Sequence, residues 1–269
     1  MDSLGLGLFM RRESISKSLF MKNLILFLTL LGLSLNLKSQ TIRVAIAANI
    51  QSVMKEIQTD FTKKIKIELE LVSGASGNLA NQIRNGAPFE LFLSADLASP
   101  ESLYKEGLCF NEVKIYARGS LIICSHSSQS LKTWKNRALT DSIKKIGLAN
   151  PQIAPYGKAA METLKKEGIY DKVKDKLIQG ESISQVNTYI TNGLVDLGFT
   201  AKSLVLDPNL KQNLYWEAIN PKNYSPIDQG MVLIKTPSGK PSPGAQLFYK
   251  YLLSPSAKAI FKRYGYLVK

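Results

Sequence analysis

Histidine and cysteine are scarce in this chain, which has one histidine and two cysteines among its 269 residues. His126 is flanked by serines, and no acid and nucleophile are placed around it as a catalytic triad requires. Clusters of histidine and cysteine that would ligate zinc are excluded. The sequence has no glycine-rich phosphate loop ending in GK[ST], and no two acidic residues are spaced as an acid and a base. This inventory disfavours an enzyme, and we expect no cofactor.

The two cysteines, Cys109 and Cys124, can form at most one bridge, so a disulfide-rich scaffold is excluded. In an oxidising compartment they could pair with each other. Cys124 ends the apolar run 121–124, which equally favours a buried free thiol. Both alternatives are compatible with the sequence.

Basic side chains outnumber acidic ones, so the formal net charge is +14 at pH 7. The lysines are dispersed over expected helix faces, and they are not clustered with aromatic residues as in a nucleic-acid-binding module. We therefore expect no nucleic-acid partner. In an exported protein, such a field attracts small anions to the surface.

The first forty residues have the pattern of a signal peptide. Arginines and lysines at positions 11, 12, 17 and 22 precede an apolar run from Leu24 to Leu35, which is short for a membrane span. Cleavage near Ser39–Gln40 would make residues 1–39 the signal peptide, with Met21 as an alternative start of translation. A retained membrane anchor is the other interpretation. No cysteine follows the run to accept a lipid. The predicted compartment lies outside the cytoplasm.

The rest of the chain alternates between strand and helix patterns. Strands are predicted at 42–47, 65–72, 89–96, 145–151, 195–199 and 229–235, with a β-rich stretch at 113–125. Helical spacing predicts helices at 50–61, 79–85, 100–106, 158–167, 185–192, 245–253 and 256–264. Segment 134–138 is expected to be loop and turn. This alternation is typical of an α/β fold with largely parallel sheets.

Small neutral residues occupy four joints that lead into predicted helices. The joints are Ala48-Asn49, Ala75-Ser76, Pro155-Tyr156 and Ser182-Ile183. In open parallel sheets, ligands bind beyond the carboxyl ends of strands, where the N–H groups and dipoles of helix N-termini attract anions. Each joint also has a structural interpretation: Asn49 and Ser76 as helix caps, Tyr156 as a surface aromatic residue and Ile183 as core.

Motifs in ordered succession narrow these alternatives. They are Ala47-Ala48-Asn49 after the first strand, SGASGNLANQI at 73–83, GAPFELFLSAD at 86–96 and FKRYGY at 261–266. Together these motifs resemble the molybdate-binding proteins of bacterial ABC importers, and the resemblance covers residues 41–269.

The resemblance implies a two-lobed periplasmic binding protein of type II, in which each lobe is a mainly parallel sheet flanked by helices and the ligand lies in the interlobe cleft. Lobe 1 would comprise residues 41–120 and 230–269, and lobe 2 residues 121–229. It also implies a monomer that captures molybdate and tungstate and delivers them to an ABC permease.

Four ligand-binding positions follow from the resemblance. They are Asn49 after the first strand, Ser76 in the serine-rich joint, Tyr156 between proline and glycine, and the main chain of Ile183. Some family members place a tyrosine where this chain has Ala201, so Tyr156 is expected to supply the hydroxyl instead. No residue ligates a bare metal ion, because the metal arrives as an oxyanion.

Neutral donors suit a fully deprotonated dianion such as molybdate, tungstate or sulfate. Hydrogen phosphate carries a proton that would be left unpaired among donors. Sulfate or another tetrahedral oxyanion is therefore the alternative ligand. An enzyme or a sensor domain on the same fold is the alternative of a different class.

Overall fold

The computed structural model describes residues 41–127 and 130–268. The predicted signal peptide lies outside the described residues. Residues Gln40–Lys269 form one compact unit. None of the helices in the described ranges combines the length and apolar character of a membrane-spanning segment.

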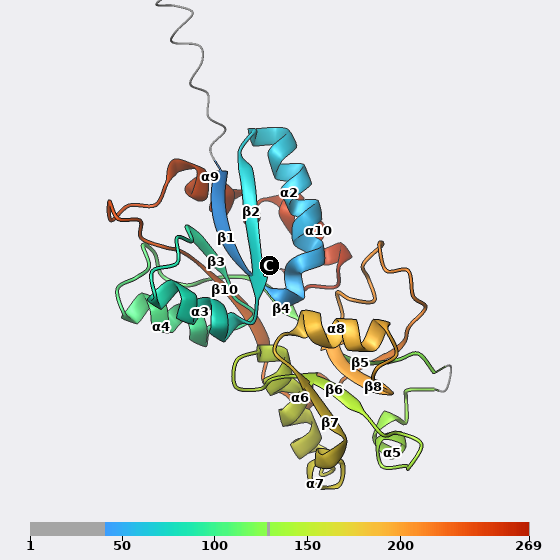
Figure 1. The fold of residues 1–269 in the computed structure, drawn as a ribbon. Coiled ribbons are helices and arrows are strands. Elements are labelled where there is room, and N and C mark those ends of the chain that lie inside the picture. Colours follow the sequence, from blue (N-terminus) through green and yellow to red (C-terminus); the bar gives the residue numbers. More distant parts are fainter. Residues whose placement is uncertain (1–40, 128–129, 269) are drawn as a thin grey trace, which may run out of the picture. The chain divides into compact units, whose positions relative to one another are not determined.

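The first sheet consists of four strands from the N-terminal half of the chain and one strand from its C-terminal part (Figure 1). Its order is β2 (Glu68–Gly74), β1 (Thr41–Ala47), β3 (Leu91–Leu93), β10 (Ile227–Leu233) and β4 (Lys114–Gly119). Strand β1 pairs in parallel with β2 and β3, whereas β10 runs antiparallel to β3 and β4. The strand that returns is therefore the reversed one.

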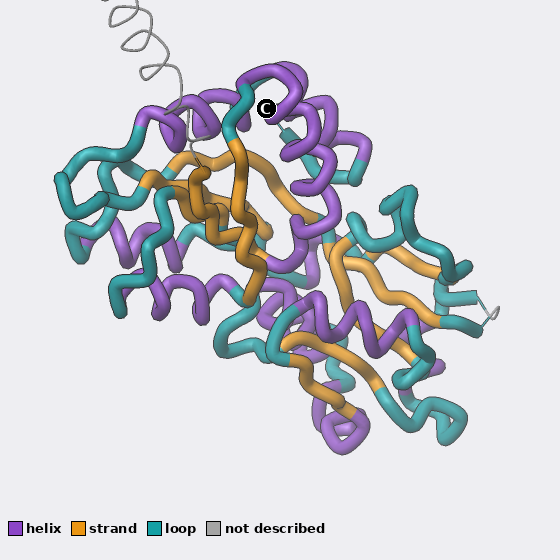
Figure 2. The backbone as a smooth tube through the Cα atoms, turned by 45° about the horizontal axis from the view of Figure 1, so that its top comes forward, coloured by secondary structure: helices purple, strands orange, loops and turns teal. Residues whose placement is uncertain are grey.

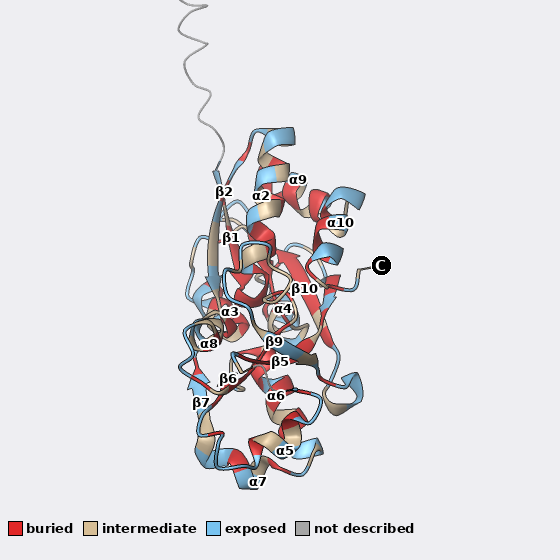
Figure 3. Ribbon diagram, turned by 90° about the vertical axis from the view of Figure 1, so that its right-hand side faces the viewer, coloured by how far each residue is buried: buried red, intermediate tan, exposed pale blue. Residues whose placement is uncertain are grey.

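Alternate side chains of β1 enter different cores on the two faces of this sheet, as the period of two requires. Ile42, Val44 and Ile46 pack with residues of α2 (Gln51–Ile65), α9 (Pro243–Leu252) and α10 (Pro255–Arg263). Ala45 packs on the other side with residues of α3 (Ser76–Arg84) and α4 (Ala98–Lys105). Figure 3 shows the resulting burial of β10 between its neighbours.

The second sheet has the same plan. Its order is β7 (Leu177–Gly180), β6 (Ile146–Ala149), β8 (Leu197–Ala201), β5 (Leu121–Ser125) and β9 (Tyr215–Ala218). Strand β6 is parallel to β7 and β8, and β5 is antiparallel to β8 and β9. Helices α6 (Pro155–Lys166) and α8 (Ile183–Thr191) contribute to its core, and Trp134 of α5 (Trp134–Ala138) meets Phe199 edge to face. Figure 2 shows helices lying alongside the strands of both sheets.

Short segments complete the architecture. They are the 3-10 turns η1 (Ala48–Ile50), η2 (Lys174–Lys176) and η3 (Pro221–Asn223), and the one-turn helix α7 (Tyr170–Val173). The chain passes from the first sheet to the second between β4 and β5, and returns between β9 and β10. The predicted two-lobed α/β fold is confirmed, with one reversed strand making each sheet mixed.

One local prediction was wrong, one is refined, and two short strands were missed. Segment 134–138 is the helix α5 and not a loop, because Trp134 and Ala138, one turn apart, are both buried against the second core. The β-rich stretch 113–125 is two strands in different sheets, divided at Ser120. Strands β7 and β9 were not predicted, since each is four residues long and mostly exposed or half-buried.

The two cysteines are separate, buried free thiols. Cys109 packs in the core beneath α3 and α4, whereas Cys124 lies within β5 in the core of the other sheet. Burial raises the pKa of the Cys109 thiol to about 12, so this group stays protonated and unreactive at neutral pH.

Candidate functional site

A small cavity lies where the two lobes meet, and it is lined by the predicted site residues Asn49, Ser76, Tyr156 and Ile183. The volume open to the centre of a water-sized sphere is about 10 Å³. That is close to the smallest cavity able to hold one water molecule. The closed cavity is therefore too small for a sugar or an amino acid.

The lining of this cavity carries no charged side chain among the described residues. Besides the four predicted residues, it consists of Ala47, Ala48, Gly74, Ala75, Ala95, Ala154 and Pro155. These are small residues at the starts of η1, α3 and α6 or at the end of β2, together with Ala95, which follows β3. The described residues also hold no group of acidic, histidine and cysteine side chains that could bind a metal ion.

Helix N-termini converge on the cavity from both lobes. Asn49 belongs to η1, which runs directly into α2, and Ser76 is the first residue of α3. In the other lobe, Tyr156 is the second residue of α6 and Ile183 the first of α8. The first-turn N–H groups of a helix have no partner within the helix, and they carry the positive end of its dipole. The arrangement can therefore hold an anion without a cationic side chain.

The structural alternative, in which Asn49 and Ser76 are helix caps, does not hold. The residue before α3 is Ala75, and the one before η1 is Ala47, and neither supplies a side-chain cap. The Ser76 hydroxyl instead accepts a hydrogen bond of 3.0 Å from the backbone N–H of Ala95. Because a hydroxyl can donate while it accepts, its proton is available to a ligand in the cavity. Helix α8, which also starts at the cavity, is capped by Ser182, and the peripheral helices α9 and α10 are capped by Ser242 and Ser254.

Asn49 is 5% exposed and is held in a buried polar cluster. Its Nδ2 donates to Gln229 Oε1 at 3.1 Å and to the Tyr266 hydroxyl at 3.0 Å. Its backbone carbonyl accepts from Tyr266 at 2.7 Å and from Ser203 Oγ at 3.0 Å. The Asn49 Oδ1 atom is buried and has no hydrogen-bond partner among the described residues.

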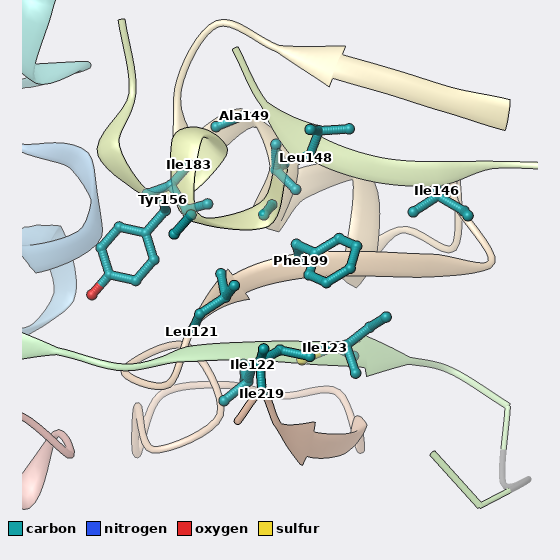
Figure 4. Packing of buried hydrophobic residues seen from close by; sticks show 14 of the residues in the cluster. Leu121, Ile122, Ile123, Ile146, Leu148, Ala149, Tyr156, Ile183, Phe199 and Ile219 are labelled. Atoms are coloured by element: carbon teal, nitrogen blue, oxygen red, sulfur yellow. The ribbon is translucent and has the colours of Figure 1, made fainter. Parts of the chain in front are cut away.

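Tyr156 is 2% exposed, so it is not the surface aromatic residue of the structural alternative. Figure 4 shows its ring beside Ile183, with the hydroxyl pointing away from the apolar residues of the second core. The hydroxyl accepts a long hydrogen bond of 3.4 Å from Gln229 Nε2. Burial raises its pKa well above 10, so the phenol remains a protonated donor at neutral pH.

Two glycines make room for this arrangement. A Cβ atom on Gly119, the last residue of β4, would lie 1.9 Å from the Tyr156 hydroxyl oxygen. A Cβ atom on Gly157 would lie 2.0 Å from the carbonyl oxygen of Ala149 at the end of β6. Both positions therefore require glycine, the first to admit the tyrosine and the second to seat the start of α6 on its strand.

Direct hydrogen bonds join the two lobes around the cavity. The backbone N–H of Gly77 donates to the carbonyl of Ile153 at 3.0 Å. Ser184 Oγ donates to Gln51 Oε1 at 2.9 Å, and Ser203 Oγ reaches the Asn49 carbonyl. The cleft is therefore closed over the cavity.

Sequence reasoning did not find the polar side chains behind the cavity. Gln229, Tyr116 and Tyr266 are fully or almost fully buried and lie 180, 67 and 217 positions from Asn49 along the chain. A buried-strand pattern at 229–235 that opens with glutamine was the only available signal. Motif FKRYGY contains Tyr266, but its connection to Asn49 depends on the tertiary fold.

Comparison with known proteins shows the family of this chain. The family model described as "Bacterial extracellular solute-binding protein" matches residues 42–267. The molybdate-binding protein ModA of Azotobacter vinelandii is 37% identical over 84% of this chain and 89% of its own length. ModA of Rhodobacter capsulatus is 34% identical, covering 89% of this chain and 93% of the relative.

A solved structure gives the same result. The periplasmic molybdate-binding protein of Azotobacter vinelandii superposes with a TM-score of 0.79 and 29% identity, over 85% of this chain and 99% of that protein. These relatives are named as binding proteins, in agreement with the expectation that this chain is not an enzyme. The chain belongs to the bacterial extracellular solute-binding proteins and, among them, to the ModA family of ABC-importer binding proteins.

Proposed function

We propose that this protein captures molybdate, and tungstate with similar affinity, in the cavity between its lobes. The observation that carries the proposal is the charge-free lining, in which Asn49, Ser76, Tyr156 and Ile183 meet at helix N-termini from both lobes. The names of the ModA relatives support the choice of ligand.

The proposed contacts are of two kinds. Ser76 and Tyr156 offer hydroxyl protons, and the first-turn N–H groups near Asn49 and Ile183 offer backbone donors. A tetrahedral dianion has four oxygens that only accept hydrogen bonds, so converging donors satisfy it without a counter-charge. Without the five basic and two acidic side chains of residues 1–39, the mature chain keeps a net charge of +11, which would draw the anion to the protein from solution.

Sulfate shares the charge and the shape of molybdate, so discrimination between them falls to cavity size. A larger ion that contacts every wall keeps all its hydrogen bonds, whereas a smaller ion must lengthen some of them. Tungstate and molybdate are close in size, and we propose similar affinity for both. Sulfate is the second candidate ligand, because its acceptors match the same donors.

Transport would follow from closure of the two lobes about the two connections between the sheets, one between β4 and β5 near residue 120 and one between β9 and β10, just before the predicted boundary at 229, which falls inside β10. Opening about these two connections would admit the anion, and closure would remove it from water. We propose that the protein is a monomer in the periplasm, and that its closed form presents the anion to an ABC permease.

Calorimetric titration of the purified protein tests the proposal. Molybdate, tungstate, sulfate and phosphate would be titrated separately at constant ionic strength. Tight binding of one molybdate and one tungstate per chain, with much weaker sulfate and phosphate binding, is expected. Tight sulfate binding with weak molybdate binding would replace the proposed ligand by the alternative.

A further inference from the structure

Buried amides form the wall behind the cavity, and their orientation decides what the cavity offers a ligand. Asn49 turns both protons of its Nδ2 inward, toward Gln229 and Tyr266. The same amide leaves Oδ1 buried without a partner. A buried acceptor without a partner is destabilising, because it has lost its hydrogen bonds to water. An acceptor is also the wrong group to place beside a dianion.

Rotating the Asn49 amide alone does not solve the problem. Its Oδ1 would then face Gln229 Oε1, which now lies 3.1 Å from Nδ2, and two acceptors would oppose each other. Rotating the Gln229 amide as well restores the contact, because Gln229 Nε2 would then donate to Asn49 Oδ1. The two amides are therefore compatible only when they turn together.

The surrounding hydroxyls accommodate both arrangements, since each has a second partner already within reach. The Tyr116 hydroxyl lies 2.8 Å from Gln229 Oε1 and 3.1 Å from the carbonyl of Ser94. It can donate to either and accept from Gln229 Nε2 in the rotated state. The Tyr116 hydroxyl proton therefore has a hydrogen-bond acceptor in each state.

The Tyr266 hydroxyl behaves in the same way. It lies 2.7 Å from the Asn49 carbonyl and 3.0 Å from the Asn49 amide, and Ser203 Oγ also reaches that carbonyl at 3.0 Å. In the rotated state Tyr266 donates to Asn49 Oδ1 while Ser203 donates to the carbonyl. The contacts of Asn49 with Gln229 and Tyr266 then each join a donor to an acceptor, and Asn49 Nδ2 is free to face the cavity.

We propose that Gln229 is a specificity-determining residue that acts through Asn49, by turning in concert with it so that Asn49 presents N–H to the bound oxyanion. The inference rests on the proposed function. Gln229 does not line the cavity, so it is a positioning residue. The contact between Gln229 and Tyr156 is long, at 3.4 Å, so the rotated Gln229 competes weakly for the tyrosine proton.

A double-mutant cycle tests the proposal, with molybdate titrated into wild type, Gln229→Glu, Asn49→Ala and the double variant. The carboxylate of Gln229→Glu only accepts, so it would hold Asn49 Nδ2 inward and lower the affinity about tenfold to a hundredfold. Gln179→Glu, on the exposed part of β7, makes the same charge change and should bind like wild type. In the Asn49→Ala background, Gln229→Glu should lower the molybdate affinity little further, because the Asn49 amide through which Gln229 acts is absent.

The outcomes separate two failures. Wild type that does not bind molybdate overturns the proposed function. Wild type that binds, with Gln229→Glu equal to Gln179→Glu, overturns the role of Gln229. If the affinity losses of the two single variants multiply in the double variant, the Gln229→Glu carboxylate repels molybdate directly, and this result would also overturn the role of Gln229. If Gln229→Glu does not fold, NMR of the wild-type side-chain amides replaces it. The NH₂ signals of Asn49 and Gln229 are assigned by their loss in Asn49→Ala and Gln229→Met, and both are expected to shift when molybdate binds. Unchanged Gln229 signals would contradict the concerted turn.

Discussion

Single hydroxyl groups carry much of the proposed chemistry at the residue scale. The buried Ser76 hydroxyl accepts from the backbone of Ala95 and keeps one proton to donate. The buried Tyr156 hydroxyl accepts from Gln229 and likewise keeps its proton. Each is therefore an oriented donor whose loss can be measured separately from the fold.

Ser76→Ala should weaken molybdate binding about tenfold to a hundredfold, because it removes one hydrogen bond to a charged ligand. It also leaves the Ala95 N–H unsatisfied, which should lower stability by about 1–3 kcal/mol. Ser254→Ala, which removes the cap of α10, is the matched control: about 1 kcal/mol of stability is lost and the affinity is kept. Equal affinity in wild type and Ser76→Ala would remove Ser76 from the site.

Tyr156→Phe should keep the packing of the ring and lose the donor. We expect weaker molybdate binding by about tenfold or more and a change in unfolding free energy below about 1.5 kcal/mol. Calorimetry and denaturant unfolding of the same samples measure the two quantities. An affinity equal to wild type would leave only the backbone N–H groups of this helix start as ligands.

At the scale of elements, the site depends on where strands end and helices begin. The small-residue joints after β1 and β2 were predicted from sequence because apolar periodicity changes there from two to helical spacing. The antiparallel direction of β5 and β10 was not predicted, since pairing direction depends on the neighbour that the fold supplies. Gln229 could not be assigned to the site for the same reason: only the sheet brings β10 behind Asn49.

Gly119→Ala tests the close approach of β4 to α6. The added Cβ would lie 1.9 Å from the Tyr156 oxygen and 2.8 Å from Gln229 Nε2, so both groups must move. We expect molybdate affinity to fall more than about tenfold, and overpacking to cost about 1–3 kcal/mol. Gly147→Ala in β6, whose nearest new contact is 3.2 Å from a Val195 methyl, should leave the affinity unchanged. A Gly119→Ala protein that binds like wild type would refute the steric argument.

For the molecule as a whole, ligand binding and stability are linked through the closed cleft. A ligand at a thousand times its dissociation constant stabilises the folded state by about 4 kcal/mol. For a domain of this size, that corresponds to a rise in Tm of roughly 8–16 °C. Thermal unfolding with molybdate should show this rise, whereas phosphate at the same concentration should give almost none. A larger shift with phosphate would contradict a site of donors alone.

Buried tyrosines give the whole molecule a predictable response to alkaline pH. Burial raises the pKa of Tyr116 and Tyr156 well above 10 and that of Tyr266 to about 12. Above pH 10 the unfolded chain releases protons that the folded chain retains, so stability falls as pH rises. The Tm should be insensitive to these groups at neutral pH and drop above about pH 10. Tyr266→Phe should reduce the slope by about 1.4 kcal/mol per pH unit; an unchanged slope would contradict the assignment.

Anomalous diffraction from crystals of the protein grown with molybdate tests the central claim most directly. The account predicts one molybdenum peak in the cavity, with its oxygens in hydrogen-bond range of donors at Asn49, Ser76, Tyr156 and Ile183 and no charged side chain in contact. A peak elsewhere, or a cavity that stays without molybdenum at saturating molybdate, would contradict it.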